Sequence, residues 1–233
     1  MNFLAIDTSS VACSVALSLA DEIAERHTEL AREHTQLLVP MIEELLSEGD
    51  VSLSDLDAFV LGNGPGSFIG MRISASLVQG MAFGVSRPVV PVSSLLAVAE
   101  AAFADGDCDE VVVAQDAHMN EVYLGRFGRA DSGEITALAP ETLHSLSVID
   151  GLGADGLGAS ARRLAAGAGW ERYPALWTAN ADAFAELSSH KAPRARHLFP
   201  CAKTSFDAGL GIDPADIEPS YLRQKVATPT SGP

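Results

Sequence analysis

The stretch that decides the fold is "GNGPGSFIGMRIS", residues 62–74, where glycine and proline give way to small and apolar side chains. A Walker phosphate loop needs a lysine followed by Ser or Thr, whereas the basic side chain in this stretch is Arg72. The dinucleotide fingerprint G-x-G-x-x-G also fails, because Ser67 and Ile69 stand where its third glycine would be. The stretch therefore predicts a strand-to-helix corner at Gly64–Gly66, with Ser67 as the N-cap of the next helix.

Composition indicates an acidic protein of the cytoplasm. The chain has 233 residues and a formal net charge of −16, from 31 acidic and 15 basic side chains. Nucleic-acid affinity comes mainly from cations that displace phosphate counterions, so we expect this chain to meet nucleic acid only through a partner. No apolar run approaches the roughly 20 residues of a membrane helix, and the N-terminus has no basic signal-peptide start. A cytoplasmic location without membrane contact is expected.

Around the glycine stretch, the first half of the chain predicts alternating strands and helices. Opening strands within residues 2–10 and 12–20 are joined by the turn-forming residues Asp7 to Ser10, and a further strand is expected within 22–30. Apolar residues at helical spacing predict helices over 33–47 and 68–84. Strands over 57–61 and 88–92 and a helix over 94–104 complete this half.

The second half repeats the order of the first. "VVVAQDAHMNEVYLGRF" places Asp116 where Asp7 stands in "FLAIDTSSVACSVALS", directly before a turn and an apolar strand. The repeat predicts the α/β class, with a duplicated β-β-β-α-β-α unit that forms two lobes around a cleft. We expect an N-terminal lobe over 1–107 and a C-terminal lobe over 108–207. Residues 208–226 are expected to pack back on the first lobe, and 227–233 to form a disordered tail.

The sequence offers no catalytic or metal site by local pattern. Its 6 histidines show neither H-x-x-x-H nor H-E-x-x-H spacing. It also lacks the G-x-S-x-G elbow of serine hydrolases. We therefore expect no catalytic residue and no metal ligand in this chain.

The sequence resembles the TsaB (YeaZ) family. The resemblance runs through "LAIDTSSVACSVAL", "HTQLLVPMIEELL", "LSDLDAFVLGNGPGSFIGMRIS", "PVVPVSSLLAVAE", "DAHMNEVY" and "PSYLR", while residues 140–205 match only in general character. It implies the two-lobed actin-like and sugar-kinase-like fold (ASKHA, ribonuclease H-like). It also implies a non-catalytic paralogue of the enzyme TsaD.

The function that the resemblance implies is the formation of N6-threonylcarbamoyladenosine at position 37 of tRNAs that read codons beginning with A. The chain would act with a TsaD-like enzyme and a TsaE-like ATPase as a scaffold or activator, and meet tRNA only through that complex. The catalytic paralogue has two metal-binding histidines, whose positions Ser94 and Val98 occupy here. Neither residue supplies an imidazole, so the resemblance implies a pseudo-enzyme without a cofactor of its own. ATP at an interface shared within the complex stays open.

A nucleotide site is the alternative that the residues themselves leave open. If this chain worked like the kinase-like members of the fold, Asp7 would hold magnesium through water, and Thr8 and Ser9 would donate hydrogen bonds to phosphate. Asp116 would be the equivalent carboxylate of the second lobe. The chain would then be an ATP-dependent phosphotransferase. We favour an Asx turn that closes the hairpin, because no lysine or other cation converges on these residues in the sequence.

A partner interface is expected on the helices over 33–47 and 68–84. Large side chains on the first would fill the space that small ones open on the second, as in a four-helix bundle with the paralogue, or with a second copy when the chain is alone. The expected interface residues are Leu37, Leu38, Met41, Leu45, Gly70, Met71, Ser74, Ala75 and Val78. That both apolar faces belong to the core is the alternative.

Overall fold

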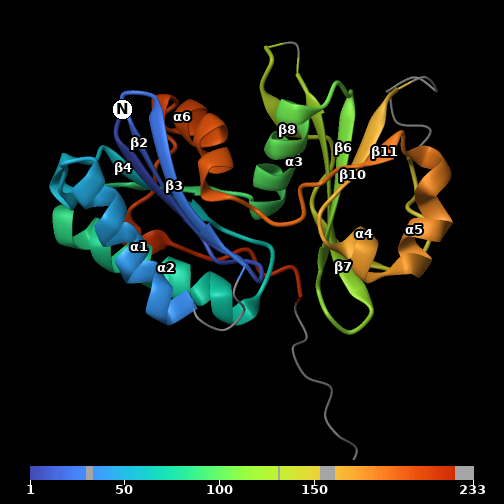
Figure 1. Cartoon of the computed structure of the whole chain (residues 1–233), viewed down its shortest axis with the longest axis horizontal. Coiled ribbons are helices and arrows are strands. Elements are labelled where there is room, and N and C mark those ends of the chain that lie inside the picture. Colours follow the sequence, from blue (N-terminus) through green and yellow to red (C-terminus); the bar gives the residue numbers. More distant parts are fainter. Residues whose placement is uncertain (30–33, 131, 153–160, 224–233) are drawn as a thin grey trace, which may run out of the picture.

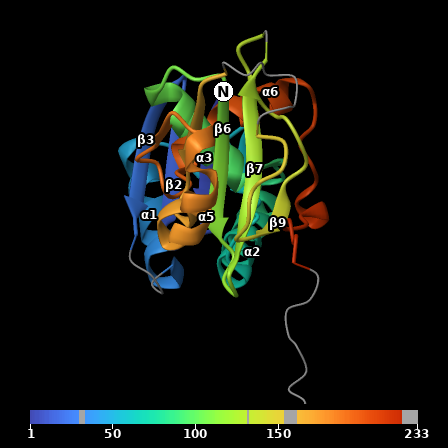
Figure 2. The same ribbon diagram turned by 90° about the vertical axis from the view of Figure 1, so that its right-hand side faces the viewer.

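The chain is a stack of layers in which two sheets alternate with helices (Figure 1). The computed structural model describes residues 1–29, 34–130, 132–152 and 161–223. The helices α1 (His34–Glu48) and α2 (Phe68–Val85) cover the outer side of the first sheet, and α4 (Gly169–Arg172) and α5 (Pro174–Asn180) cover that of the second. Between the sheets lie α3 (Ser94–Asp105) and α6 (Phe199–Asp207). Figure 2 shows the same stack with α5 toward the viewer.

The two sheets share one strand order, which confirms the predicted duplication. The first runs β3-β2-β1-β4-β5 and the second β8-β7-β6-β10-β11. In each, the first three strands of the repeat pair antiparallel, and the last two strands join the sheet through parallel pairs. The strands of the first sheet are β1 Phe3–Asp7, β2 Cys13–Leu19, β3 Glu22–Thr28, β4 Ala58–Gly62 and β5 Val89–Val92. Those of the second are β6 Glu110–Asp116, β7 Glu121–Arg129, β8 Ile135–Ala137, β10 Arg163–Ala166 and β11 Glu186–Leu187, with β9 Thr142–Ser145 paired to β7.

The second copy departs from the first in its helices. Among the described residues between β8 and β10 there is a strand, β9, where the first copy has α1 between β3 and β4. The short helices α4 and α5 take the place of the long helix α2. The outer core of the second sheet is filled instead by aromatic rings: Trp170 packs edge-to-face on Phe184, with ring centroids 4.9 Å apart.

The helices between the sheets cross from one lobe to the other. α3 follows the first sheet in sequence but packs on β6, β7 and β8 of the second. α6 follows the second sheet but packs on β5, and its Phe206 ring lies 5.2 Å from that of Phe3 in β1. The predicted lobes, residues 1–107 and 108–207, stay a prediction. The predicted disordered tail over 227–233 lies outside the described residues. Apolar residues from both sheets and both helices thus form one shared core.

The helix α2 is long and apolar enough to span a membrane by length and composition alone. Its buried residues include Met71, Ser74 and Val78, and they lie against the first sheet. Ser67 caps its N-terminus, since its Oγ accepts a hydrogen bond from the Gly70 amide at 3.2 Å, which confirms the predicted cap. In this structure α2 is a surface helix with one face on the core.

The half-buried Glu100 on α3 gives a testable pH dependence. Burial, opposed by Arg129 and helped by Glu134, raises the pKa of its carboxyl from 4.5 to about 7. Because the folded state binds this proton more tightly than the unfolded state, the stability from this group falls as pH rises through about 7. We expect Glu100→Gln to be more stable than the parent in urea at pH 8, and the difference to shrink toward pH 5. A difference that is the same at both pH values would contradict the burial of this carboxyl.

Candidate functional site

The predicted site around Asp7 lies where β1 ends, between the glycine corner after β4 and the start of α3. The Asp7 side chain is 1% exposed, and its Oδ1 accepts hydrogen bonds from the Ser9 amide at 2.8 Å and the Ser9 hydroxyl at 2.7 Å. Its Oδ2 accepts one from the Ser94 hydroxyl at 2.6 Å. The Gly64 amide donates to the same hydroxyl at 3.0 Å, and the Ser94 amide donates to the Gly64 carbonyl at 2.9 Å. Asp7 therefore joins the turn, the corner and α3.

The glycine stretch is shaped by this turn. A Cβ at Gly62 would overlap the Asp7 carboxylate, and one at Gly66 would overlap the Ser9 carbonyl oxygen. The Ser67 amide donates to that same carbonyl at 2.6 Å. Because Gly62 and Gly66 have no side chain, the corner can lie directly on the turn after β1. Any larger residue at either position would push the corner and the turn apart.

The remaining groups of the turn are also used within the chain. Thr8 is buried, and its hydroxyl donates to the Gly70 carbonyl at 2.7 Å. Ser9 is 4% exposed, and its hydroxyl donates a hydrogen bond to the Asp7 carboxylate. The side-chain donors that would meet a phosphate are thus turned inward, as the Asx-turn interpretation requires.

The protonation of Asp7 reflects two opposing effects. Burial raises the pKa of its carboxyl, and the hydrogen bonds from Ser94 and Ser9 lower it. The role of the Asp7 carboxyl in the fold is to accept these hydrogen bonds, because each donor around it would otherwise be buried without a partner.

We expect Asp7→Ala to destabilise the fold by about 2–4 kcal/mol, since it leaves the Ser9 amide and the Ser94 hydroxyl without their acceptor. This is more than the contribution of an exposed turn carboxylate, because Asp7 is wholly buried. Urea unfolding of Asp7→Ala beside Asp213→Ala, an exposed carboxylate that also closes a local turn, measures the difference. A loss no larger than that of the control would reopen a ligand-binding role for Asp7.

Asp116 closes the equivalent turn of the second lobe but is more open. Its Oδ1 accepts from the Tyr173 hydroxyl at 2.6 Å and from the His118 amide at 2.7 Å. Its Oδ2 lies 3.3 Å from His118 Nδ1 and 3.9 Å from Arg172 Nε. No hydrogen bond or ion pair among the described residues joins Asp116 to Asp7. The Tyr173 contact spans 57 positions in the sequence, so no local pattern could have indicated it.

Ser94 and Val98, where the resemblance places the paralogue's histidines, lie on α3. Ser94 is bonded to Asp7, and Val98 is buried in the core between the sheets. Beside them, the Ser93 hydroxyl contacts the Glu141 carboxylate and caps α3 through the Leu95 amide at 3.1 Å. Among residues 1–29, 34–130, 132–152 and 161–223, no group of three or more His, Cys, Asp and Glu gathers in a way that could hold a metal ion.

The predicted interface residues lie on the predicted helices but mostly on their buried faces, and this corrects their assignment. Seven of them pack into the core under the first sheet or against its turn: Leu38, Leu45, Gly70, Met71, Ser74, Ala75 and Val78. Leu37 and Met41 are half-buried. Gly70, Ser74 and Ala75 allow α2 to approach the first sheet and the turn after β1, and Leu38 and Leu45 of α1 fill the core beside them.

The solvent-facing side of α2 forms an outer stripe, which we define as Ile69, Ser76, Gly80, Phe83 and Gly84. Ile69 is 70% exposed and Phe83 73%. A Cβ at Gly80 or Gly84 would meet nothing within 4 Å. Glycine inside a helix costs about 1 kcal/mol relative to alanine, and among the described residues no neighbour comes close enough to require glycine at either position. The two glycines four positions apart in "GMAFG", residues 80–84, are the sequence signal that could have located this stripe.

The comparisons with known proteins agree on one relationship. A family model described as "TsaD: tRNA N6-adenosine threonylcarbamoyltransferase" matches residues 19–227. The tRNA threonylcarbamoyladenosine biosynthesis protein TsaB of Haemophilus influenzae is 36% identical, over 97% of this chain and 95% of its own. TsaB of Escherichia coli is 35% identical, over 97% and 96%. The solved structure of YeaZ from Pseudomonas aeruginosa superposes with a TM-score of 0.82 at 33% identity, covering 95% of this chain and 99% of that one.

Proposed function

This chain belongs to the TsaB (YeaZ) family, and from that membership we propose that it works in the biosynthesis of threonylcarbamoyladenosine in tRNA. Its role in the proposal is that of a non-catalytic partner, which scaffolds or activates a TsaD-like enzyme together with a TsaE-like ATPase. The modified base is the adenosine at position 37 of tRNAs that read codons beginning with A. The chain meets tRNA only as part of that complex, because its net charge is −16.

The observation that carries the proposal is the uncovered outer stripe of α2. Gly80 and Gly84 weaken the helix without serving a close contact with any residue that the structure describes, and Phe83 beside them is 73% exposed. Small residues with a large apolar neighbour are what a second helix needs for close packing. We take the TsaD-like paralogue as the occupant, and a second copy of this chain as its replacement when the paralogue is absent.

The closed turn at Asp7 supports the non-catalytic part of the proposal. Both of its carboxylate oxygens accept hydrogen bonds from this chain, and the Thr8 hydroxyl is bonded to Gly70. The other function considered from the sequence, an ATP-dependent phosphotransferase, would need these groups to face a nucleotide. We expect ATP, where the complex holds it, at an interface that the partners share.

The test is reconstitution from purified components. The TsaD-like paralogue, the TsaE-like ATPase, tRNA and threonylcarbamoyl adenylate are mixed with and without this chain, and modified adenosine is quantified by mass spectrometry. We expect repeated turnover only when the chain is present, and neither modification nor ATP hydrolysis by the chain alone. ATP turnover by the isolated chain would support the phosphotransferase instead.

A further inference from the structure

The C-terminal segment Gly211–Arg223, which we call the strap, runs along one side of α2 (Figure 1). It begins at the edge of the first sheet, where Ile212 exchanges both backbone hydrogen bonds with Val89 of β5, at 2.8 and 3.0 Å. From there it passes α2, whose Gln79 side chain donates to the Pro214 carbonyl at 2.8 Å. The strap is therefore fixed to α2 and β5 along its first half.

The middle of the strap is bonded to the glycine corner. The Asn63 side chain donates to the Glu218 carbonyl at 3.0 Å, and the Ser220 amide donates to the Asn63 carbonyl at 3.0 Å. Tyr221 then lies over the start of α2: its hydroxyl accepts from Arg72 Nε at 3.0 Å, and its ring lies 5.5 Å from that of Phe68. These bonds satisfy the Glu218 carbonyl and the Ser220 amide of the strap within the chain.

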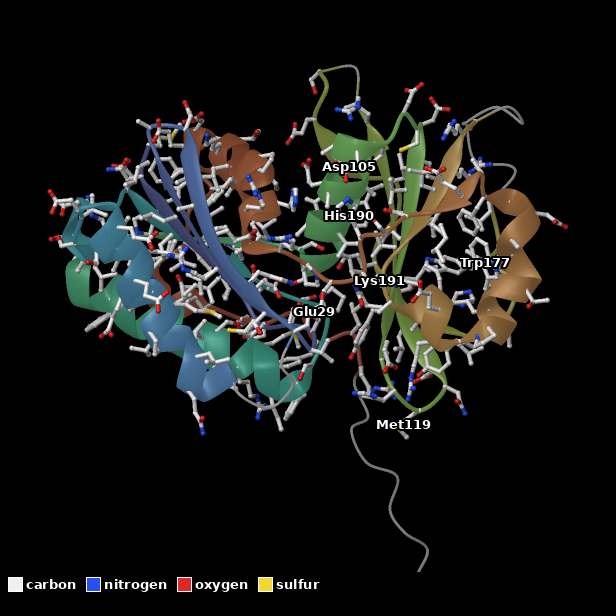
Figure 3. The ribbon with its side chains drawn as sticks, in the orientation of Figure 1. Glu29, Asp105, Met119, Trp177, His190 and Lys191 are labelled. Carbon is white, nitrogen blue, oxygen red and sulfur yellow. The ribbon has the colours of Figure 1, made fainter. Side chains whose placement is uncertain are left out.

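The strap ends on the other lobe. Arg223 donates to the Ala117 carbonyl at 2.9 Å and pairs with the Glu121 carboxylate at 2.7 Å, and its guanidinium lies 3.5 Å from the Met119 sulfur. Ala117 and Met119 belong to the turn between β6 and β7, residues 117–120, and Glu121 is the first residue of β7; Figure 3 shows Met119 at the tip of the turn. The Arg223 side chain is only 17% exposed, so its two bonds are partly shielded from water.

The β6–β7 turn needs an external hold because its backbone is strained. His118, Met119 and Asn120 have φ of 59°, 56° and 59°. Residues with a Cβ visit this left-handed region singly and at a cost, and three in succession are uncommon. A charge-assisted bond from Arg223 to the carbonyl at the start of the turn opposes its opening.

The strap contacts also border the outer stripe of α2. At 3.6 residues per turn, Phe68, Arg72 and Gln79 lie on the side of α2 next to that stripe. Phe68 is 40% exposed and Tyr221 41%, so both rings remain open to a chain that docks on α2. A partner on the stripe would therefore touch the strap as well.

We propose that the strap is the second element of the docking surface, with Tyr221 as a partner contact and Arg223 as the latch through which docking on α2 stabilises the β6–β7 turn. The occupant is the TsaD-like paralogue, and in this respect the inference rests on the proposed function. The latch itself is a property of the isolated chain.

The latch is tested without a partner by amide hydrogen exchange. We expect Arg223→Ala to speed exchange of the Ala117 and Glu121 amides about tenfold, because both are hydrogen-bonded within the turn that Arg223 holds. Arg223→Lys keeps the charge but loses the planar guanidinium and its Nη1 contact with the Met119 sulfur, and it should fall between. Arg196→Ala removes an exposed arginine elsewhere and serves as the matched control. Equal exchange in Arg223→Ala and the control overturns the latch.

The docking half is tested by adding the purified TsaD-like paralogue. It should slow exchange of the same two amides about tenfold in the parent and have no such effect in Arg223→Ala. Tyr221→Ala should weaken its affinity about tenfold. If the paralogue binds with full affinity to Tyr221→Ala and leaves the turn unchanged, the docking role of the strap is wrong. If it fails to bind the parent at all, the proposed function falls and the docking half with it, while the exchange of the isolated chain still decides the latch.

Discussion

Gly84→Leu is expected to abolish association with the TsaD-like paralogue while leaving the fold intact. In the free chain a side chain at this position enters open space, since a Cβ there meets nothing within 4 Å. In the complex the same side chain would stand where a partner helix comes close, and overpacking of that kind weakens affinity about 100-fold or more. Titration calorimetry measures the affinity, and circular dichroism with thermal unfolding measures the fold.

The matched control is Thr178→Leu, which adds a similar side chain at an exposed position of α5 on the other sheet. It should bind like the parent. Gly84→Leu that binds with parental affinity would move the interface away from α2. Gly84→Leu that unfolds would mean that the stripe is needed by the chain itself, contrary to the open space above it.

Gly70→Ala should destabilise the chain by about 2–3 kcal/mol, whereas Gly84→Ala, in the same helix, should stabilise it by about 1 kcal/mol. A Cβ at Gly70 would overlap the Thr8 carbonyl oxygen, a backbone atom that cannot move aside alone. The Thr8 hydroxyl also bonds the Gly70 carbonyl, so the helix and the turn would have to separate. At Gly84 the methyl group meets nothing, and only the helix-forming tendency changes.

Urea unfolding of both variants and the parent decides this pair. The comparison removes the general effect of a glycine-to-alanine change, since both positions are helical. A Gly70→Ala variant that is no less stable than the parent would show that the start of α2 does not lie on the turn after β1 as described.

The sequence predicted most elements because their signals are local. The helices expected over 33–47 and 68–84 are found over 34–48 and 68–85, and the Ser67 cap is present. The duplication around Asp7 and Asp116 was visible because both precede a turn and an apolar strand, and the shared strand order of the two sheets confirms it. Hydrophobic periodicity and capping act over a few residues, which is why a single sequence carries them.

The face of α2 could not be predicted in the same way. Apolar and small residues occur on more than one side of this helix, so periodicity gives several stripes and does not say which lies on the sheet. The choice depends on β4 and on the Asp7 turn, which are distant in sequence. The contacts of Tyr173 with Asp116 and of Arg223 with Ala117 are equally long-range, and no residue near either partner indicates them.

The turn at Asp7 and the outer stripe of α2 have different roles: the turn stabilises the fold, and the stripe is the surface that we propose for docking. The first lobe uses its carboxylate and hydroxyls to fix β1, the glycine corner and α3 against one another. The same arrangement holds α2 on the sheet with Gly80 and Gly84 outward. The buried Asp7 carboxylate, which would be costly to leave without hydrogen bonds, thus stabilises the position of α2, the helix that we propose as the docking element.

The central claim is that the chain supports a TsaD-like enzyme by docking through α2, without chemistry of its own. Its most direct test is the yield of threonylcarbamoyladenosine in the reconstituted reaction, measured with the parent chain, with Gly84→Leu, with Thr178→Leu and with no chain. The account predicts full yield with the parent and Thr178→Leu, and the same low yield with Gly84→Leu as with no chain. Full yield with a folded Gly84→Leu, or modification of tRNA by this chain without the TsaD-like enzyme, would contradict it.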